Sequence, residues 1–252
     1  MGCTAVIALA LIGSATALAA ARLQASTAAA WDVYVRATET RIARELKSAA
    51  GFLAFDFHGD AAVIRRALLS GDAIVRTVDA PRVDGRPVDI PSGRVEHWLG
   101  AVLIPGTSAL QLIGALEQGP PPSDDVLQSA VLERGPDWML VSMRLQRKAI
   151  VTVTYDTVHI VTFSTVSSSR ATSTSTAVLI HEIGDDHGFL WRLNAYWRYE
   201  EVPGGVIAEC ESITLSRDIP SMVRFIVGPV VERTARETMT KTLLTLRDRF
   251  RR

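Results

Sequence analysis

The sequence is poor in cysteine, has no excess of charge of either sign, and has no long apolar run beyond its N-terminal segment. Only two of its 252 residues are cysteines, and 27 basic side chains balance 27 acidic ones. Balanced charge argues against a surface for nucleic acid. After the first residues, no apolar run reaches the roughly 20 residues that a bilayer requires, so we expect the body of the chain to meet a membrane only transiently.

The sequence also lacks the motifs of several common reactions. It contains no GxSxG nucleophile elbow, no phosphate-binding loop and no GxGxxG fingerprint. His181-Glu182 does not begin a zinc-protease HExxH motif, because Asp185 stands at the position of the second histidine. We therefore predict no catalytic residue, no metal site and no cofactor.

Residues 181–187 (HEIGDDH) resemble an acid/base or metal site at first sight. If Gly184-Asp185 is a two-residue hairpin loop, His187 pairs with Glu182, and the two histidines point to opposite faces of the hairpin. We therefore predict solvated turn residues. A three-residue loop would place both histidines on one face, which leaves a metal site as the alternative.

The N-terminal segment is uncharged from Cys3 to Ala21 and ends in the small-residue pattern Ala17-Leu18-Ala19. This pattern is typical of a signal peptide, so we predict that residues 1–25 direct export to the periplasm or the medium. No Lys or Arg precedes the apolar run, which leaves an uncleaved anchor as the alternative. After cleavage Cys210 could form no intrachain disulfide, and we interpret it as a small buried hydrophobe.

Residues 26–93 are predicted to form a helical extension with a short hairpin. Apolar residues recur at helical spacing over residues 31–50, which indicates an amphipathic helix. A second helix is expected between Asp60, a suitable N-cap, and Gly71, a suitable stop. The dipeptide Asp84-Gly85 predicts a hairpin that joins the apolar stretches on either side of it.

From Arg94 the character changes to a series of strands. Segments rich in β-branched and aromatic residues follow one another as far as residue 217, with turn signals between them. The Ser/Thr-rich tract from Ser164 to Thr176 belongs to this series, because its threonines alternate and an apolar run follows. One helix interrupts the strands and is capped by Thr107 or Ser108.

The chain ends in a segment with helical periodicity. Gly228-Pro229 is expected to divide it into a short helix and a long one, because proline is tolerated in a first turn but not in a helix interior. A single apolar stripe on the long helix predicts that it lies against the strands. The stripe consists of Ala235, Met239, Leu243, Leu246 and Phe250.

This order of elements resembles the helix-grip fold of the START/SRPBCC superfamily, which includes Bet v 1-like proteins, polyketide cyclases and lipid-transfer domains. Residues 213–231 and 242–250 resemble the passage from the last strand to the closing helix in its bacterial members, and the nearest likeness is to an exported branch. The resemblance implies an α+β fold for residues 94–252, with a curved antiparallel sheet of about seven strands wrapped on the C-terminal helix. It also implies an apolar cavity that holds a lipid, sterol or polyketide, and it transfers no catalytic residue.

The aromatic segment that ends at Tyr199 is predicted to form one wall of this cavity. Strand alternation places its large apolar side chains on one face, and two-residue turns at either end add small side chains from the neighbouring strands. On the opposite face, Arg198 near Glu209 and Glu211 indicates a surface salt-bridge ladder. The predicted wall consists of Thr172, Thr174, Thr176, Val178, Trp191, Leu193, Trp197, Tyr199, Cys210 and Ser212.

Three functional hypotheses follow. In the first, which we favour, the protein binds or carries a hydrophobic small molecule or lipid in an apolar cavity, in the bacterial envelope. In the second, a cyclase- or hydrolase-like enzyme uses an inward His97, an inward His159 or a carboxylate with a shifted pKa. In the third, Trp191 and Trp197 are fully packed, and side chains fill the cavity of a structural or interaction protein. Alternation allows only one of His97 and its neighbour Trp98 to point inward.

Overall fold

The computed structural model describes residues 22–120, 125–148, 152–184, 187–218 and 221–250. The predicted signal peptide or anchor, residues 1–25, therefore lies almost wholly outside the described residues. Within the described ranges, no helix is both long and apolar enough to cross a bilayer.

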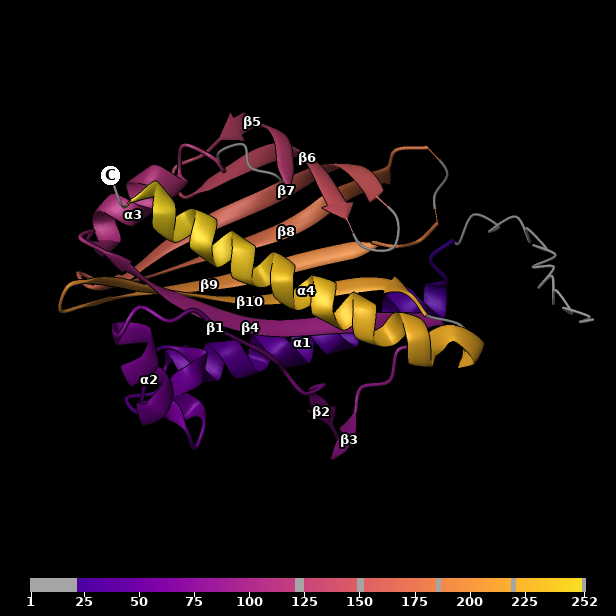
Figure 1. Ribbon diagram of the computed structural model, residues 1–252, viewed down its shortest axis with the longest axis horizontal. Helices are drawn as coiled ribbons and strands as arrows, with labels where there is room; N and C mark the ends of the chain where they lie inside the picture. The colour runs from indigo at the N-terminus through magenta and orange to yellow at the C-terminus, as the bar shows by residue number, and fades with distance from the viewer. Residues whose placement is uncertain (1–21, 121–124, 149–151, 185–186, 219–220, 251–252) are drawn as a thin grey trace, which may run out of the picture.

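One antiparallel sheet of eight strands dominates the molecule, in the order β1-β4-β10-β9-β8-β7-β6-β5 (Figure 1). From β5 to β10 each strand pairs with the next along the chain, which confirms the predicted meander. The strands are β1 (Ile74–Thr77), β4 (Gly93–Pro105), β5 (Val126–Arg134), β6 (Trp138–Lys148), β7 (Thr152–Ser167), β8 (Arg170–Glu182), β9 (Arg192–Val202) and β10 (Gly205–Arg217).

The helices are α1 (Ala25–Leu46), the 3-10 helix η1 (Ala54–Phe57), α2 (Ala61–Leu69), α3 (Ala109–Leu116) and α4 (Ser221–Arg249). Helix α3 begins at the predicted cap, where Ser108 Oγ accepts a hydrogen bond from the Gln111 backbone N–H. Gln111 Oε1 in turn accepts one from the Ser108 backbone N–H, which completes a capping box.

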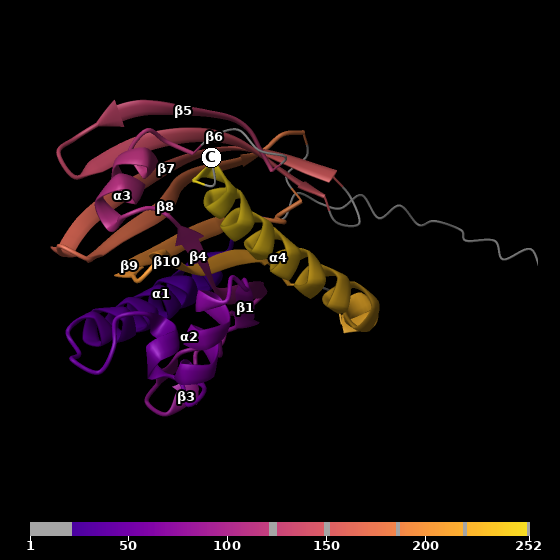
Figure 2. The same ribbon diagram turned by 60° about the vertical axis from the view of Figure 1, so that its left-hand side comes forward.

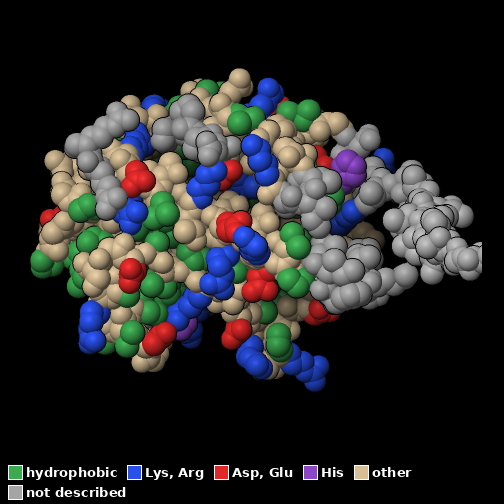
Figure 3. All heavy atoms as spheres, in the orientation of Figure 1, with side chains coloured by type: hydrophobic (Ala, Val, Ile, Leu, Met, Phe, Trp, Pro, Cys, Tyr) green, Lys and Arg blue, Asp and Glu red, His purple; other side chains and the backbone are tan. Residues whose placement is uncertain are grey.

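The two faces of the sheet are covered by different parts of the chain. Helices α3 and α4 pack on one side, here called the inner face, which carries Trp98 and Cys210. Helices α1, α2 and η1 pack on the other side, the outer face, which carries Ile207 and Ile213. Figure 2 shows α4 and the N-terminal helices on opposite sides of the central strands. On the surface seen from the α4 side, acidic and basic side chains are interspersed (Figure 3).

This architecture confirms the predicted α+β helix-grip fold, with one strand more than expected. The extra strand is β1, which pairs with β4 so that Ile74 lies opposite Ala101. Ile74 packs on the outer-face core and Val75 on the inner-face core, so β1 buries side chains on both of its faces. A two-stranded hairpin could not bury both faces, which explains why this stretch joins the large sheet.

Two local predictions were therefore wrong. The Asp84-Gly85 turn does form, with φ of 50° and 76°, but it joins only the short strands β2 (Arg82–Val83) and β3 (Arg86–Pro87). Helix α4 runs without a break through Pro229. Proline removes one backbone hydrogen bond from a helix, and here the helix continues in spite of that loss.

Candidate functional site

Half of the predicted wall lies on the inner face of the sheet. The turn at Pro203-Gly204 sets the register of β9 and β10, so that Trp197 lies opposite Cys210 and Tyr199 opposite Ala208. The rings of Trp197 and Tyr199 stack, with centroids 6.1 Å apart. The predicted register of these two strands is confirmed. Leu193, Trp197, Tyr199, Cys210 and Ser212 share the inner face.

The predicted positions of Thr172, Thr174 and Thr176 were wrong. Ser173, rather than Thr172, lies opposite Trp197, so the register of β8 and β9 differs by one residue from the prediction. A slip of one residue moves every side chain of a strand to the other face. The three threonines therefore lie on the outer face, while Ser173 and Ser175 take the inner positions. The reason is that β8 ends at Glu182 and β9 begins only at Arg192, so residues 183–191 separate the two strands instead of the two residues that the prediction assumed.

Val178 and Trp191 also lie away from the predicted wall. A β-bulge at Val178 breaks the pairing of β7 and β8, and the Val178 side chain is 54% exposed. Trp191 precedes the first residue of β9, so strand alternation does not fix its direction. It packs against the outer-face core that contains Trp31 and Ile213.

The inner face is covered unevenly. Helix α4 lies over β4 and β1, where Met239 and Leu243 of its apolar stripe are buried. Further along the sheet, the inner-face side chains of Leu193, Ala195 and Trp197 are only half-buried. The apolar surface on β9 is thus left partly uncovered by the closing helix.

His159 is the most unusual residue of the inner face. It lies on β7 between Val141 and Ala177, and only 2% of its surface is exposed. Its Nδ1 atom is 3.1 Å from Ser175 Oγ, and its Nε2 atom has no hydrogen-bond partner among the described residues. Burial lowers the pKa of His159 to about 4, so the imidazole is neutral near pH 7. A neutral imidazole offers one donor and one acceptor, so Nε2 can still bind one polar atom.

The surroundings of His159 are mainly apolar. The paired inner-face positions of β6 and β7 hold buried Met139, Val141, Leu145 and Tyr155. Two other polar side chains on this face, Ser173 and Tyr199, form a hydrogen bond with each other, with 3.0 Å between Oγ and Oη. Burial raises the pKa of Tyr199, so its hydroxyl keeps its proton.

The outer face holds a network of charges that the sequence did not reveal. Glu211 Oε1 is 2.6 Å from His97 Nε2, and the Arg41 guanidinium of α1 also binds this carboxylate. His97 Nδ1 is 2.9 Å from the Tyr34 hydroxyl. Burial disfavours the charged form of Glu211, but His97 and Arg41 outweigh it and hold the pKa at about 2. His97 therefore points away from the inner face, and Trp98 points toward it.

Glu209 binds the backbone of the N-terminal extension. Its Oε1 accepts a hydrogen bond of 2.6 Å from the Ala54 N–H, and its Oε2 one of 3.0 Å from the Phe55 N–H. Burial raises the pKa of Glu209 to about 7, although Arg198, with Nε 3.8 Å away, acts in the opposite direction. Arg198 also binds Glu45 of α1, with 2.6 Å between Nη2 and Oε2.

The predicted salt-bridge ladder is thus correct in its pairing and wrong in its exposure. Arg198 does lie opposite Glu209, but their exposed fractions are 3% and 1%. The reason is that α1 and η1 cover this part of the sheet, and no local sequence pattern indicates where the extension packs.

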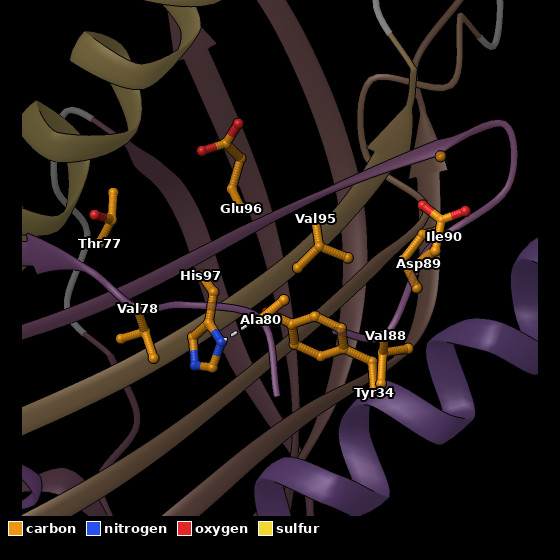
Figure 4. A pocket seen from close by; sticks show the side chains of 11 residues that line it. Tyr34, Thr77, Val78, Ala80, Val88, Asp89, Ile90, Val95, Glu96 and His97 are labelled. Atoms are coloured by element: carbon orange, nitrogen blue, oxygen red, sulfur yellow. Dashed lines mark hydrogen bonds between the residues drawn. The ribbon is translucent and has the colours of Figure 1, made fainter. Parts of the chain in front are cut away.

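A cleft of about 300 Å³ opens beside this network (Figure 4). It is lined by Tyr34 of α1, by residues before and after the short hairpin and by the start of β4: Thr77, Val78, Ala80, Val88, Asp89, Ile90, Gly93, Val95, Glu96 and His97. In Figure 4 Glu96 points away from His97, as strand alternation requires. The two nitrogens of His97 are bound to Tyr34 and Glu211, so the imidazole contributes no free polar atom to the cleft.

The histidines of residues 181–187 are not brought together by the described residues. His187 Nδ1 is 2.7 Å from Glu182 Oε1, and Glu182 is buried, whereas His181 is exposed. His187 and Glu182 are thus in contact through their side chains, but not as the predicted pair of neighbouring strands, because β8 and β9 pair only as far as Thr176 and Asn194. Glu182 is also not a solvated turn residue. Residues 185–186 of the predicted hairpin loop lie outside the described residues. Among the described residues, no group of three or more His, Cys, Asp or Glu side chains is arranged to hold a metal ion.

Comparison with solved structures returns proteins of similar fold. A fragment of the STAR-related lipid transfer protein of Xanthomonas axonopodis is 20% identical, covers 71% of this chain and 94% of its own, and gives a TM-score of 0.49. The lipid transfer and protein localization domain of human StarD13 is 14% identical, covers 77% and 98%, and gives a TM-score of 0.43. The Zhui aromatase/cyclase of a Streptomyces species is 13% identical, covers 63% and 93%, and gives a TM-score of 0.40.

No family model matches the sequence, and no curated protein matches it. The similarities to solved structures are too distant to carry a ligand or a reaction to this chain. The fold rests on the order of the strands and on the long closing helix. By these features the chain has a helix-grip fold, with a long antiparallel sheet and a closing C-terminal helix.

Proposed function

We propose that this protein binds a hydrophobic small molecule or lipid between the inner face of its sheet and helix α4, and that it does so as an exported protein of the bacterial envelope. The observation that carries the proposal is His159. Nearly all buried polar atoms in proteins have a hydrogen-bond partner, and His159 Nε2 has none among the described residues. A ligand with one polar group and a large apolar body would satisfy Nε2 and cover the inner face.

The half-buried aromatic surface supports the same proposal. Trp197 packs against the inner-face core but is only half-buried, so part of its ring is left for a ligand to cover. Leu193 and Ala195 extend this apolar surface along β9. Together they offer a hydrophobic ligand a surface that water covers otherwise.

The cyclase- or hydrolase-like alternative is less well supported. It requires an inward histidine with a shifted pKa, and His159 is inward and shifted. The direction of the shift is unfavourable, because a group whose pKa is about 4 is a weak general base near pH 7. Binding needs only the hydrogen-bonding capacity of the neutral ring, so it remains the better-supported function.

The test is native mass spectrometry, with lipid extraction, of the protein purified from the envelope of its own host. We expect a reproducible apolar molecule to co-purify with the wild-type protein and to be lost from Trp197→Ala. Val178→Ala serves as the matched control, because Val178 is an exposed side chain of the neighbouring strand. An empty wild-type protein that gains no thermal stability from a panel of lipids would refute the proposal. Recovery from the cytoplasm with an intact N-terminus would refute export.

A further inference from the structure

Arg147 is a cation on the inner face of the sheet. Arg147 and Leu145 are two residues apart on β6, so their side chains lie on the same face, and Leu145 is buried on the inner face. Arg144 has the opposite parity and points to the outer face. The Arg147 side chain is half-buried. Burial lowers its pKa, and Asp125 and Tyr155 act in the opposite direction. A guanidinium remains charged under these conditions, so the inner face carries a partly desolvated positive charge at this end.

No described acidic side chain forms an ion pair with Arg147. Its one described polar contact is from Nη1 to the Gln146 carbonyl oxygen, at 3.3 Å. The described acid that acts on its pKa is Asp125, which is held beside β6 by a backbone hydrogen bond of 3.0 Å from Gln146 N–H to Asp125 O. Asp125 Oδ1 is also 3.5 Å from Lys241 Nζ of α4. Asp125 is thus engaged by Lys241 as well as acting on Arg147, and it forms no ion pair with Arg147.

Arg144 provides the contrast on the same strand. Its Nε is 2.7 Å and its Nη2 2.9 Å from the two carboxylate oxygens of Asp156, so its charge is matched by a bidentate partner. A half-buried arginine that lacks such a partner is suited to bind a carboxylate or a phosphate.

We propose that the ligand of the inner face is an anionic amphiphile, whose carboxylate or phosphate binds Arg147 and whose apolar body extends along β7 toward His159. This inference rests on the function proposed above and adds the chemical class of the ligand. Val153, opposite Arg147, and His159 are six positions apart on β7, about 20 Å at strand spacing. Leu145, Tyr155 and Val141, all buried, lie between them on the same face of β6 and β7.

The experiment compares three probes with one chain length and different head groups: hexadecanoate, hexadecyl phosphate and hexadecanol. Each is titrated into wild type, Arg147→Gln, Arg147→Lys and Arg144→Gln, with affinity measured by calorimetry and folding checked by circular dichroism. We expect wild type to bind at least one anionic probe roughly ten- to a hundredfold more tightly than hexadecanol, the range of a charge-assisted hydrogen bond. The stronger of the two anionic probes identifies the head group.

The variants separate this inference from the proposed function. Arg147→Gln is expected to bind all three probes about equally, and Arg144→Gln to behave as wild type. Arg147→Lys retains a point charge and is expected to keep part of the preference, which tests the charge even if the glutamine variant folds poorly. Equal binding of hexadecanol and the anionic probes by wild type would overturn the anionic ligand and leave lipid binding intact. Failure of wild type to bind any probe would overturn both.

Discussion

At the scale of single residues, the pKa values of two glutamates on one face of β10 are shifted in opposite directions. Glu211 has two cationic or hydrogen-bonding partners at its carboxylate, and its pKa falls to about 2. Glu209 is buried against two backbone N–H groups with its arginine 3.8 Å away, and its pKa rises to about 7. The difference shows that the partner, rather than the depth of burial, decides the charge of each group.

Glu209 predicts a dependence of stability on pH. Because its pKa rises from 4.5 to about 7 on folding, its contribution to stability is fully present below pH 4.5 and is lost as the pH rises through 7. Between pH 5.5 and 8.5 we expect the wild type to lose stability, on the order of 3 kcal/mol or less, as Glu209 ionises. In Glu209→Gln, which has no carboxylate at this position, this loss is expected to be absent. Urea denaturation at both pH values measures it, with the exposed Glu133→Gln as control. Identical pH dependence in wild type and Glu209→Gln would contradict the prediction.

His159 predicts a variant that loses ligand without losing the fold. His159→Leu removes the ring whose Nε2 has no hydrogen-bond partner among the described residues, so the one described hydrogen bond that is lost is the contact with Ser175. We expect the free energy of unfolding to change by about 1 kcal/mol or less. The affinity for hexadecanoate or for the co-purified molecule is expected to fall about threefold to tenfold, measured by calorimetry. A large loss of stability with unchanged affinity would show that the imidazole is structural.

At the scale of elements, the N-terminal extension is attached to the sheet by polar groups as well as by apolar packing. Arg198 of β9 binds Glu45 of α1 and the Phe52 carbonyl oxygen, at 2.6 Å and 2.9 Å. Asp56, in η1, accepts two hydrogen bonds from Arg65 of α2, which also binds Glu200 of β9. These contacts order η1 and the two helices over the outer face.

Arg198 is the test of this attachment. Arg198→Met leaves buried Glu209 without its cation and removes one of the two arginines on Glu45, which keeps Arg41 at 2.8 Å. Loss of a buried charged partner costs about 3–5 kcal/mol of unfolding free energy. Arg192→Met, at an exposed position of the same strand, is expected to stay within about 0.5 kcal/mol of wild type. Equilibrium denaturation in urea compares the two. Equal effects would mean that apolar contacts alone hold the extension.

The two hairpins around β9 differ in whether the sequence predicts the register of their strands. The turn at Pro203-Gly204 has only two central residues, so counting outward from it along both strands correctly predicts that Trp197 lies opposite Cys210. The connection between β8 and β9 is longer, and counting outward from an assumed two-residue turn puts the threonines of β8 on the wrong face. Longer connections leave the register to the packing of whole faces, which local sequence does not encode.

At the scale of the whole molecule, the order of elements was predictable because each long strand and the closing helix carries its own periodicity. The docking of residues 26–93 was not, because α1 covers the sheet with Tyr34, Arg41 and Glu45, whose partners lie far away in sequence. Single-sequence patterns report local structure, and these contacts are not local. For this reason the local pattern of Arg198 and Glu209 predicts a surface ladder where the structure has a buried network.

A ligand bound between the sheet and α4 is expected to stabilise the molecule as a unit, because the native state holds it and the unfolded chain does not. At a free concentration one hundred times its dissociation constant, such a ligand adds about 2.7 kcal/mol to the free energy of unfolding. Urea denaturation with increasing hexadecanoate measures this gain, which Trp197→Ala is expected to reduce and Val178→Ala to leave unchanged. A midpoint that is independent of the hexadecanoate concentration, or a gain that persists undiminished in Trp197→Ala, would place the binding elsewhere than on the inner face.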